Sequence, residues 1–432
     1  MTTYLGGDTY YNEPFLVQGN LTVVGSVTTP TINATSGTVT TLGTTTSNIG
    51  MANITTLNAP TGRTGYVIAA SDAPASVKAQ ANAVVSTSVS TLINAAISAG
   101  YRDIELSEGI TAASFPITTN IYVPSQVGIH GRGEAVTYLT QAYDGVCFII
   151  GSGSVGAIAS QLTGFQLDGA NRSYSATSDA IQIASPGAVG NYTYGLLFQD
   201  LKITNFKGRA IYGTCFQDSV FRDIQIGECG YSSNQTVRLD GTSTIQTSSN
   251  VFYGLHMDGG YFQLFLNNYC NANKFILPKF EGGNEAITNL VEIDGCFNLI
   301  DGATSGVTSP NAAFRGVLFN EAWGLHCHDN IICNSTLMSD GSGSTIAIAP
   351  GATGYGNKVV NNTVSGFTYG IDSTGGTGNQ VIGNHTYGNT HGITLRGTAE
   401  ADLILGNIVN DDAWTPGTGY IIRSNIGIAD SP

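Results

Sequence analysis

Charged residues are scarce in this chain, and basic ones most of all. Asp, Glu, Lys and Arg make up 11% of its 432 residues, with 16 basic against 30 acidic side chains and a net charge of −14. A protein that binds nucleic acid neutralises phosphates with clustered Lys and Arg. We therefore expect no nucleic-acid partner. The 41% of apolar residues can still bury a long core, which excludes general disorder.

Paired cysteine motifs and long apolar runs are also missing. The odd number and scattered spacing of the cysteines argue against a disulfide framework, and we expect most of them to be buried apolar residues: Cys147, Cys215, Cys229, Cys270, Cys296, Cys327 and Cys333. No apolar run reaches membrane-spanning length, so we expect no membrane insertion. The first residues, MTTYLGGDTYYNEPF, lack a signal peptide, which predicts synthesis in the cytoplasm.

What the sequence does contain is a repeat near its C-terminal end. Asn357 and Asn379 open successive units, Ala401 stands at the same interval further on, and Asn362 and Asn384 keep this spacing. A fixed period of about 22 residues is typical of repeat architectures. Each unit holds short β-branched runs separated by Gly and Asn, without a helical pattern. We predict a right-handed parallel β-helix with three short strands in each rung of about 22 residues.

Similar echoes occur in the middle of the chain. The string FQDLKI at 198–203 returns as FRDIQI at 221–226, and NVFYGLHMDGG at 250–260 returns as NKFILPKFEGG at 273–283. Both echoes follow after nearly the same interval as the C-terminal repeat. The same spacing gives Asp200 and Asp223 equivalent positions in successive rungs.

The N-terminal part has a different composition. We predict an anchoring segment at 1–20 and a Thr/Ser-rich intertwined stalk at 21–62, followed by a transition with a capping helix at 63–100 and the β-helix at 101–432. Thr and Val favour extended chain, and three copies wound around one axis would bury the sparse apolar residues of 21–62. A flexible Ser/Thr-rich linker is the alternative.

One helix is expected in the transition. Val89, Leu92, Ile93, Ala96 and Ile97 form one stripe, with Ser86 or Ser88 as the N-cap and Gly100 at the C-terminal end. The order AQANAVV, INAAISAG, RDIELSEGIT and VPSQVGIHGRG resembles the opening of pectate-lyase-like right-handed β-helix proteins. The resemblance implies that the helix covers the open end of the rungs.

With the Thr-rich stretch before it, the chain also resembles viral or phage tailspike and receptor-binding spike proteins. That resemblance implies a homotrimer on the virion surface, joined through its N-terminus to a capsid or tail protein and attached to a host glycan or glycoprotein. The motifs of polygalacturonases and pectate lyases are absent, so no catalytic residue is carried over from them. Nothing in the sequence indicates a cofactor.

Two acidic residues are the candidates for catalysis. Asp258 and Glu281 occupy the same position in successive rungs, which lie about 4.8 Å apart. Retaining glycosidases use two carboxylates at about 5 Å, one as the nucleophile and one as the acid/base. Both residues precede glycine pairs, however, and the alternative is that they only solvate turns.

The surrounding stretch is the candidate binding surface. Aromatic faces with convergent polar groups recognise sugars, which favours glycan contacts by five residues: Tyr253, His256, Tyr261, Tyr269 and Glu285. Core packing of the aromatics is the alternative. His326, His328 and Cys333 lack a fourth ligand and familiar zinc spacing, so we predict no metal site.

The sequence therefore predicts a viral spike or tail-fibre protein for host attachment. The rival hypotheses are a tailspike-like depolymerase, either a glycoside hydrolase or a lyase, and a cellular carbohydrate-binding β-helix surface protein.

Overall fold

The computed structural model separates the chain into two compact units, Met1–Thr64 and Gly65–Pro432. It describes the backbone of six short strands in the first unit. In the second it describes all residues except 110, 112–113, 153–154, 171–172, 186–190, 231–234, 260–261, 283–288, 308–313, 321–326, 341–344, 352–353, 412–417, 424 and 427–432. The finer boundaries predicted at 20, 62 and 100 stay predictions.

The strands of the first unit pair in parallel. The pairs are β1 (Thr2–Gly6) with β3 (Asn20–Val24), β2 (Thr9–Tyr10) with β4 (Val27–Thr28), and β5 (Thr38–Val39) with β6 (Asn53–Ile54). The remainder of the predicted anchoring segment and stalk lies outside the described residues, and an intertwined stalk stays a prediction.

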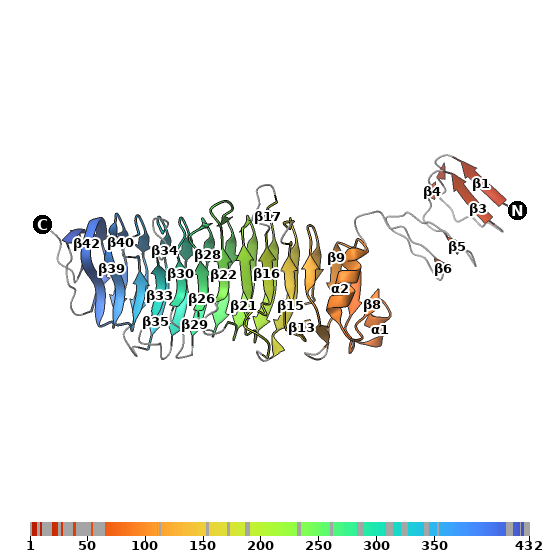
Figure 1. Ribbon diagram of the computed structural model, residues 1–432, viewed down its shortest axis with the longest axis horizontal. Coiled ribbons are helices and arrows are strands. Elements are labelled where there is room, and N and C mark those ends of the chain that lie inside the picture. The colour runs from red at the N-terminus through yellow and green to blue at the C-terminus, as the bar shows by residue number, and fades with distance from the viewer. Residues whose placement is uncertain are drawn as a thin grey trace. The chain divides into compact units, whose positions relative to one another are not determined.

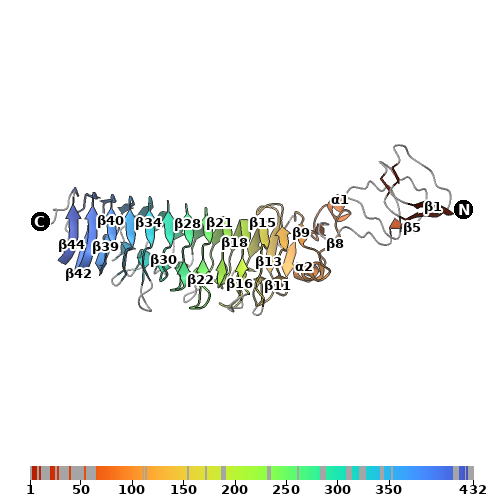
Figure 2. The same cartoon turned by 90° about the horizontal axis from the view of Figure 1, so that it is seen from above.

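The second unit is a stack of parallel rungs that follow one another in chain order (Figures 1 and 2). In a typical rung, β18 (Leu197–Thr204) bends at Asp200 and so contributes to two faces, and β19 (Ile211–Thr214) contributes to a third. We name the strands before the bend face 1, those after it face 2, and the remaining side face 3. The predicted right-handed parallel β-helix is confirmed.

Face 1 runs the length of the stack. It begins with β7 (Tyr66–Ala69), which also pairs with β8 (Ala83–Val84), and continues through β9 (Asp103–Leu106), β12 (Gly128–His130), the first parts of β15 (Gln161–Asp168), β18 and β21 (Val220–Gly227), β24 (Val251–Tyr253), β28 (Lys274–Ile276), β31 (Leu299–Asp301), β34 (Ile331–Cys333), β37 (Lys358–Val360), β40 (Gln380–Ile382), the end of β42 (His391–Leu405) and β44 (Thr418–Arg423).

Faces 2 and 3 complete the rungs. Face 2 holds β10 (Phe115–Ile117), β13 (Tyr138–Gln141), the second parts of β15, β18 and β21, β25 (His256–Asp258), β29 (Lys279–Gly282), β32 (Thr304–Val307), β35 (Thr336–Ser339), β38 (Thr363–Ser365), β41 (His385–Tyr387) and β43 (Ile408–Val409). Face 3 holds β11 (Ile121–Val123), β14 (Phe148–Ile150), β16 (Ile181–Ala184), β19, β22 (Gln235–Asp240), β26 (Phe262–Leu266), β30 (Asn289–Ile293), β33 (Arg315–Phe319), β36 (Ile346–Ala349), β39 (Tyr369–Thr377) and the start of β42. A short corner sheet joins β17 (Thr193–Tyr194), β20 (Phe216–Gln217), β23 (Thr247–Ser248) and β27 (Cys270–Asn271).

The echoes in the sequence correspond to strand pairs. Phe198 pairs with Phe221, and Asp258 pairs with Glu281. The inward residues of successive face 1 strands stack: the Phe221 and Phe252 rings lie 4.2 Å apart and those of Phe252 and Phe275 4.7 Å apart. Offset aromatic stacking adds to the burial free energy, so each rung stabilises its neighbours.

The predicted helix is α2 (Val89–Ser98), at the first end of the stack (Figure 1). The Ser88 hydroxyl is the N-cap and accepts the Thr91 backbone N–H. Val89, Ile93 and Ala96 are buried, so the helix covers the end of the core as expected. The short helix α1 (Ala75–Lys78) was not predicted, because so short a segment does not show a helical period.

Buried asparagines connect the rungs before face 1. Asn250, Asn273, Asn298, Asn330, Asn357 and Asn379 are at most 1% exposed, and each side-chain oxygen accepts the backbone N–H of the equivalent residue one rung earlier. A second ladder, through Asn362, Asn384 and Asn407, follows the bend between faces 1 and 2. The asparagines that marked the repeat therefore satisfy buried backbone groups.

All seven cysteines are free, and six are buried as expected; Cys333 is half-buried. Among the described residues, no helix is long and apolar enough to cross a membrane.

Candidate functional site

The predicted carboxylate pair lies on the outward side of face 2. Asp258 in β25 stands directly opposite Glu281 in β29. Glu281 accepts hydrogen bonds from Lys279 Nζ at 2.7 Å and His256 Nε2 at 2.8 Å. The Lys279 contact first, and then the His256 contact, lowers the pKa of the Glu281 carboxyl. Glu281 is thereby kept ionised, which suits a nucleophile or hydrogen-bond acceptor and not a proton donor.

The predicted glycan contacts are only partly brought together. His256 lies beside the carboxylate pair, and Tyr253, 43% exposed, ends β24 just before the bend. Tyr269 lies next to β27 in the corner sheet, away from faces 1 and 2. Tyr261 and Glu285 lie outside the described residues.

A groove toward the helix-capped end was not predicted as a site. It has a volume of about 720 Å³ and follows the bend between faces 1 and 2 over β12, β15, β18 and β21. Most of its lining residues have polar side chains: His130, Arg132, Glu134, Gln161, Thr163, Gln199, Asp200, Asp223 and Gln225, with Leu197 and three glycines. The echo between 198–203 and 221–226 had placed Asp200 and Asp223 in successive rungs. That repeat did not indicate the loop after β12, which forms part of the groove.

Two glycines form the floor of that groove. The Gly131 N–H donates to Thr163 O, and the Gly133 N–H donates to Gly164 O, both at 2.8 Å. A Cβ atom at Gly131 would lie 2.1 Å from the Gly164 carbonyl oxygen, so only glycine permits this approach. The loop that begins here places Glu134 beside Gln225, and the Gln225 side-chain amide donates to the Glu134 carboxylate at 3.4 Å. Residues far apart in the sequence thus form one wall.

The charges of the groove are mixed. The Arg132 guanidinium makes two hydrogen bonds, at 2.9 and 2.8 Å, to Glu105. His130 Nδ1 contacts the Thr163 hydroxyl at 2.8 Å, and Asp200 and Asp223 are exposed. Three carboxylates therefore line the groove against one guanidinium that is already paired. The amides, hydroxyl and carboxylates together offer many donors and acceptors to a polar ligand.

The groove and the predicted pair belong to one surface. Gln225 pairs with His256, and Gly227 with Asp258, across β21 and β25. The outward surface of the bent sheet therefore runs from the groove to Tyr253, His256 and the carboxylate pair. We name this surface the polar groove face.

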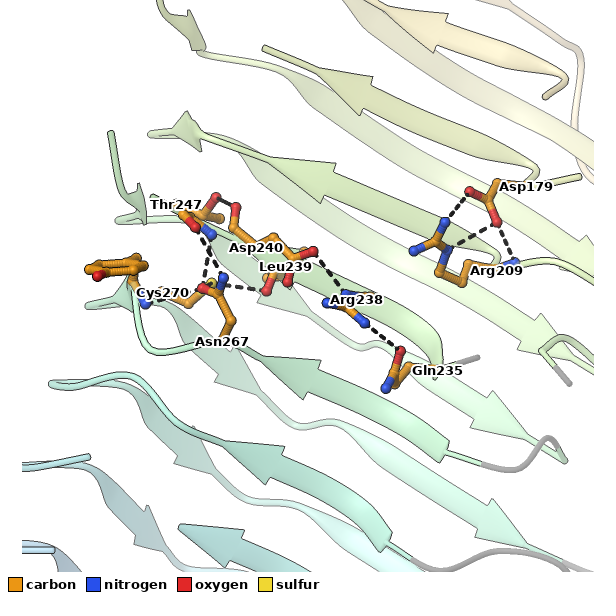
Figure 3. A network of polar contacts seen from close by, with 11 residues as sticks. Asp179, Arg209, Gln235, Arg238, Leu239, Asp240, Thr247, Asn267 and Cys270 are labelled. Atoms are coloured by element: carbon orange, nitrogen blue, oxygen red, sulfur yellow. Dashed lines mark hydrogen bonds and ion pairs between the residues drawn. The ribbon is translucent and has the colours of Figure 1, made fainter. Parts of the chain in front are cut away.

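Face 3 carries a separate polar network (Figure 3). Arg238 donates to Asp240 at 2.8 Å, and Arg209 pairs with Asp179 at 2.9 Å and covers the Tyr212 ring at 3.7 Å. Cys270 donates to Leu239 O at 3.1 Å, and burial raises the pKa of its thiol well above the usual value. With its charges paired and its thiol protonated, this network braces the rungs and offers no nucleophile.

The histidine and cysteine considered for a metal do not meet. His328 Nδ1 contacts Asp329 at 2.9 Å, whereas the Cys333 thiol contacts Asp301 at the far end of β34. His326 lies outside the described residues. Within the described part of the chain, no three His, Cys, Asp or Glu side chains form a group that could hold a metal ion.

Neither a protein-family model nor a curated protein matches this chain. Solved structures similar to it include the A-module of the mannuronan C-5 epimerase AlgE6 of Azotobacter vinelandii, with 14% identity over 79% of this chain and 95% of that one and a TM-score of 0.43. PfbA, a surface adhesin of Streptococcus pneumoniae, has 11% identity over 77% and 87% of the two chains and a TM-score of 0.48. Tailspike protein 3 of bacteriophage CBA120 has 10% identity over 80% of this chain and 60% of that one, with a TM-score of 0.39.

These identities are too low to transfer a function. The fold rests on the register of the strands themselves: parallel pairs one rung apart, a bend between faces 1 and 2, and a helix over the first end. The chain has the right-handed parallel β-helix fold of pectate-lyase-like proteins.

Proposed function

We propose that this protein binds an extended glycan along the polar groove face. The observation that supports this most is the groove of about 720 Å³, open along the rungs and lined by amide, hydroxyl, guanidinium and carboxylate groups. Sugar hydroxyls need such donors and acceptors. The repeat of outward side chains every rung of about 4.8 Å suits a polymer that runs along the stack.

The charges favour one class of glycan. Glu134, Asp200 and Asp223 lie in the groove, and the Arg132 guanidinium is engaged by Glu105. A polyuronate would bring like charges against these carboxylates. Neutral or amino-sugar oligosaccharides are therefore the preferred ligands.

The finer proposal is that this binding attaches a virus particle to its host. The Thr-rich stretch before the capping helix supports it, since such a segment gains most by winding around further copies of itself. On this proposal the protein is a homotrimeric spike or tail fibre held to the virion through its N-terminus. Light scattering on the full chain tests the trimer, and a monomer at micromolar concentration would contradict it.

Affinity for oligosaccharides tests the glycan proposal. With neutral, amino-sugar and uronic-acid oligosaccharides as probes, we expect calorimetry to detect binding of the first two classes. Replacing Asp223→Asn together with Gln225→Ala should weaken it at least about tenfold, or about 1.4 kcal/mol, because two groove contacts are lost. Gln217→Ala with Asp218→Asn is the matched control, since these residues lie just before β21, outside the groove. Equal losses in both double variants would contradict the proposal.

A polysaccharide depolymerase is the second candidate, favoured by the register of Asp258 with Glu281. We expect the wild-type protein, incubated with host-envelope polysaccharide, to release new reducing ends if the pair is catalytic. Asp258→Asn and Glu281→Gln should then each abolish the release, because retaining hydrolysis needs both carboxylates. Activity that survives either substitution would exclude this pair, while leaving glycan binding in the groove untouched.

A further inference from the structure

Face 1 changes character along the stack. Up to β21, its outward residues are mostly polar: Asp103, Glu105, His130, Gln161, Thr163, Gln199 and Arg222. From β28 onward most are apolar. We name as the apolar stripe Ile276, Leu299, Ile331, Cys333, Val360, Ile382, Leu403, Leu405 and Ile421, which lie on adjacent strands in register, and Leu277, which follows β28. Among the described side chains, four polar residues occupy the remaining outward positions: Lys274, Asp301, Lys358 and Gln380.

The stripe is accessible along its length. Leu277 is 53% and Ile421 42% exposed, and its other members are half-buried. Phe297, 55% exposed, and Tyr355 extend it at one edge, with the His328 ring between them at 5.0 and 4.4 Å. On the same rungs, face 2 presents Thr304, Thr336, Thr363 and Ser365, with Met338, Tyr387 and Ile408 exposed among its polar residues. Outward apolar side chains therefore recur on every rung of face 1 but only on some rungs of face 2.

Two members of this surface adopt a backbone that large side chains avoid. Leu277 (φ 52°) and Phe297 (φ 58°) are left-handed, at positions where the next rungs use Gly302 and Asp329. A left-handed conformation costs roughly 1–2 kcal/mol in a residue with a side chain. The left-handed backbone recurs at the bends and corners of successive rungs, where Asp200, Asp223 and Asn334 also adopt it. Large exposed apolar side chains at such positions favour a surface that is covered in the assembled protein.

The dimensions of the stripe restrict what covers it. From β28 to β44 the stripe spans seven rungs, about 29 Å at a rung spacing of about 4.8 Å. From Phe297 to Gly302 it is about 16 Å wide at about 3.3 Å per residue, which makes an area on the order of 500 Å². Two such surfaces bury about 1,000 Å², the lower limit for a specific interface.

We propose that the apolar stripe packs against another copy of this chain. A second copy aligned with the same axis presents apolar side chains at the same spacing, so a match on one rung is repeated on every rung. Face 2 lacks this continuity, because β29 and β32 present only Lys279, Glu281, Thr304 and Gly306 outward. The proposal gives the homotrimer proposed above a contact surface. It does not depend on glycan binding, because the polar groove face lies over earlier rungs and, on the rung of β28 and β29 that both surfaces share, over face 2.

Site-specific photo-cross-linking of the full chain tests this proposal. Leu299 is replaced by p-benzoylphenylalanine in one variant, and Thr304, on the same rung of face 2, in the control. In purified protein without added partners, we expect position 299 to give at least about fivefold more covalent oligomer than position 304, since only the first lies at the interface. Equal yields from the two positions, or no oligomer from position 299, would overturn the proposal. A stripe that is covered by a different protein would give this second result, because no such protein is present.

A pair of charge substitutions provides a second test of the same interface. Leu299→Asp with Ile331→Lys leaves the net charge unchanged, as does the control pair Thr304→Asp with Thr336→Lys. The cross-linking probe for both pairs is placed at Leu403, some four rungs from Leu299. We expect the stripe pair, and not the control pair, to remove at least about nine-tenths of the cross-linked oligomer, because charges buried at the interface oppose the contact. Circular dichroism checks that both variants fold. The same loss in both pairs, or in neither, would contradict the assignment.

Discussion

Replacing Asn330→Ala should lower the free energy of unfolding by about 3–6 kcal/mol, because alanine leaves several buried groups without partners, at about 1–3 kcal/mol each. Asn330 is fully buried, and its amide accepts the Asn298 backbone and side-chain N–H groups and donates to Gly295 O at 2.8 Å. The guanidinium midpoint measures the loss, and hydrogen exchange should locate it in the rungs on either side.

Asn334→Ala is the matched control for this prediction. Asn334 follows the other end of β34, is exposed, and donates to Asp301 at 2.9 Å. Since water replaces an exposed partner, we expect a loss below about 1.5 kcal/mol, mostly from its left-handed backbone. If both alanine variants lose the same stability, the buried ladder is not what joins the rungs.

Asp294→Asn should raise the free energy of unfolding by up to about 4 kcal/mol above neutral pH. This is the free energy that corresponds to the pKa shift which burial imposes on the Asp294 carboxyl. Asp294 is 3% exposed, and its Oδ1 atom has no hydrogen-bond partner. Burial first, and then the Glu292 charge, raises the pKa of the Asp294 carboxyl from 3.8 to about 7.

The sign of this effect follows from the protons bound. Between pH 3.8 and 7 the unfolded chain releases the Asp294 proton more readily than the folded one, so the folded state is progressively destabilised as the pH rises. Above pH 7 the penalty is complete. We therefore expect the stability gained by Asp294→Asn to be near zero at about pH 4 and to increase up to about pH 7. A gain independent of pH, in denaturation series of both proteins, would exclude a buried charge as the cause.

The architecture could be predicted from the sequence because it repeats. A strand in a β-helix pairs with the equivalent strand one rung away, so a local spacing of about 22 residues fixes a long-range contact. This is why Phe198 over Phe221 and Asp258 over Glu281 were found in advance. Ser88, one of the two predicted N-caps of α2, is the cap in the structure, since capping depends on neighbouring residues.

The groove could not be predicted in the same way. In its wall Glu134 contacts Gln225, and in its floor Gly131 lies against Gly164. Both contacts depend on a loop that interrupts the repeat of about 22 residues. Nothing local marks such contacts. Tyr269 shows the converse: it is close in sequence to Tyr253 and His256, yet a rung turns a corner within this distance and places it in the corner sheet.

The apolar stripe was also hidden, for another reason. Apolar residues in succession along a short strand, as in Ile331, Ile332 and Cys333, do not show which side faces the core. Only the register assigns Ile332 to the core and its neighbours to the surface. The structure thus separates two outward surfaces on one bent sheet, the polar groove face nearer the helix cap and the apolar stripe beyond it.

Glycan binding as proposed requires that the groove between faces 1 and 2 hold the sugar. A crystal structure of the full chain with a neutral or amino-sugar oligosaccharide that binds in calorimetry tests it most directly. We expect the sugar over β15, β18 and β21, with hydroxyls in hydrogen-bond contact with Gln225 and at least one of Asp200 and Asp223. An oligosaccharide bound elsewhere, such as on face 3 or on the apolar stripe, with the groove holding only water, would contradict the account.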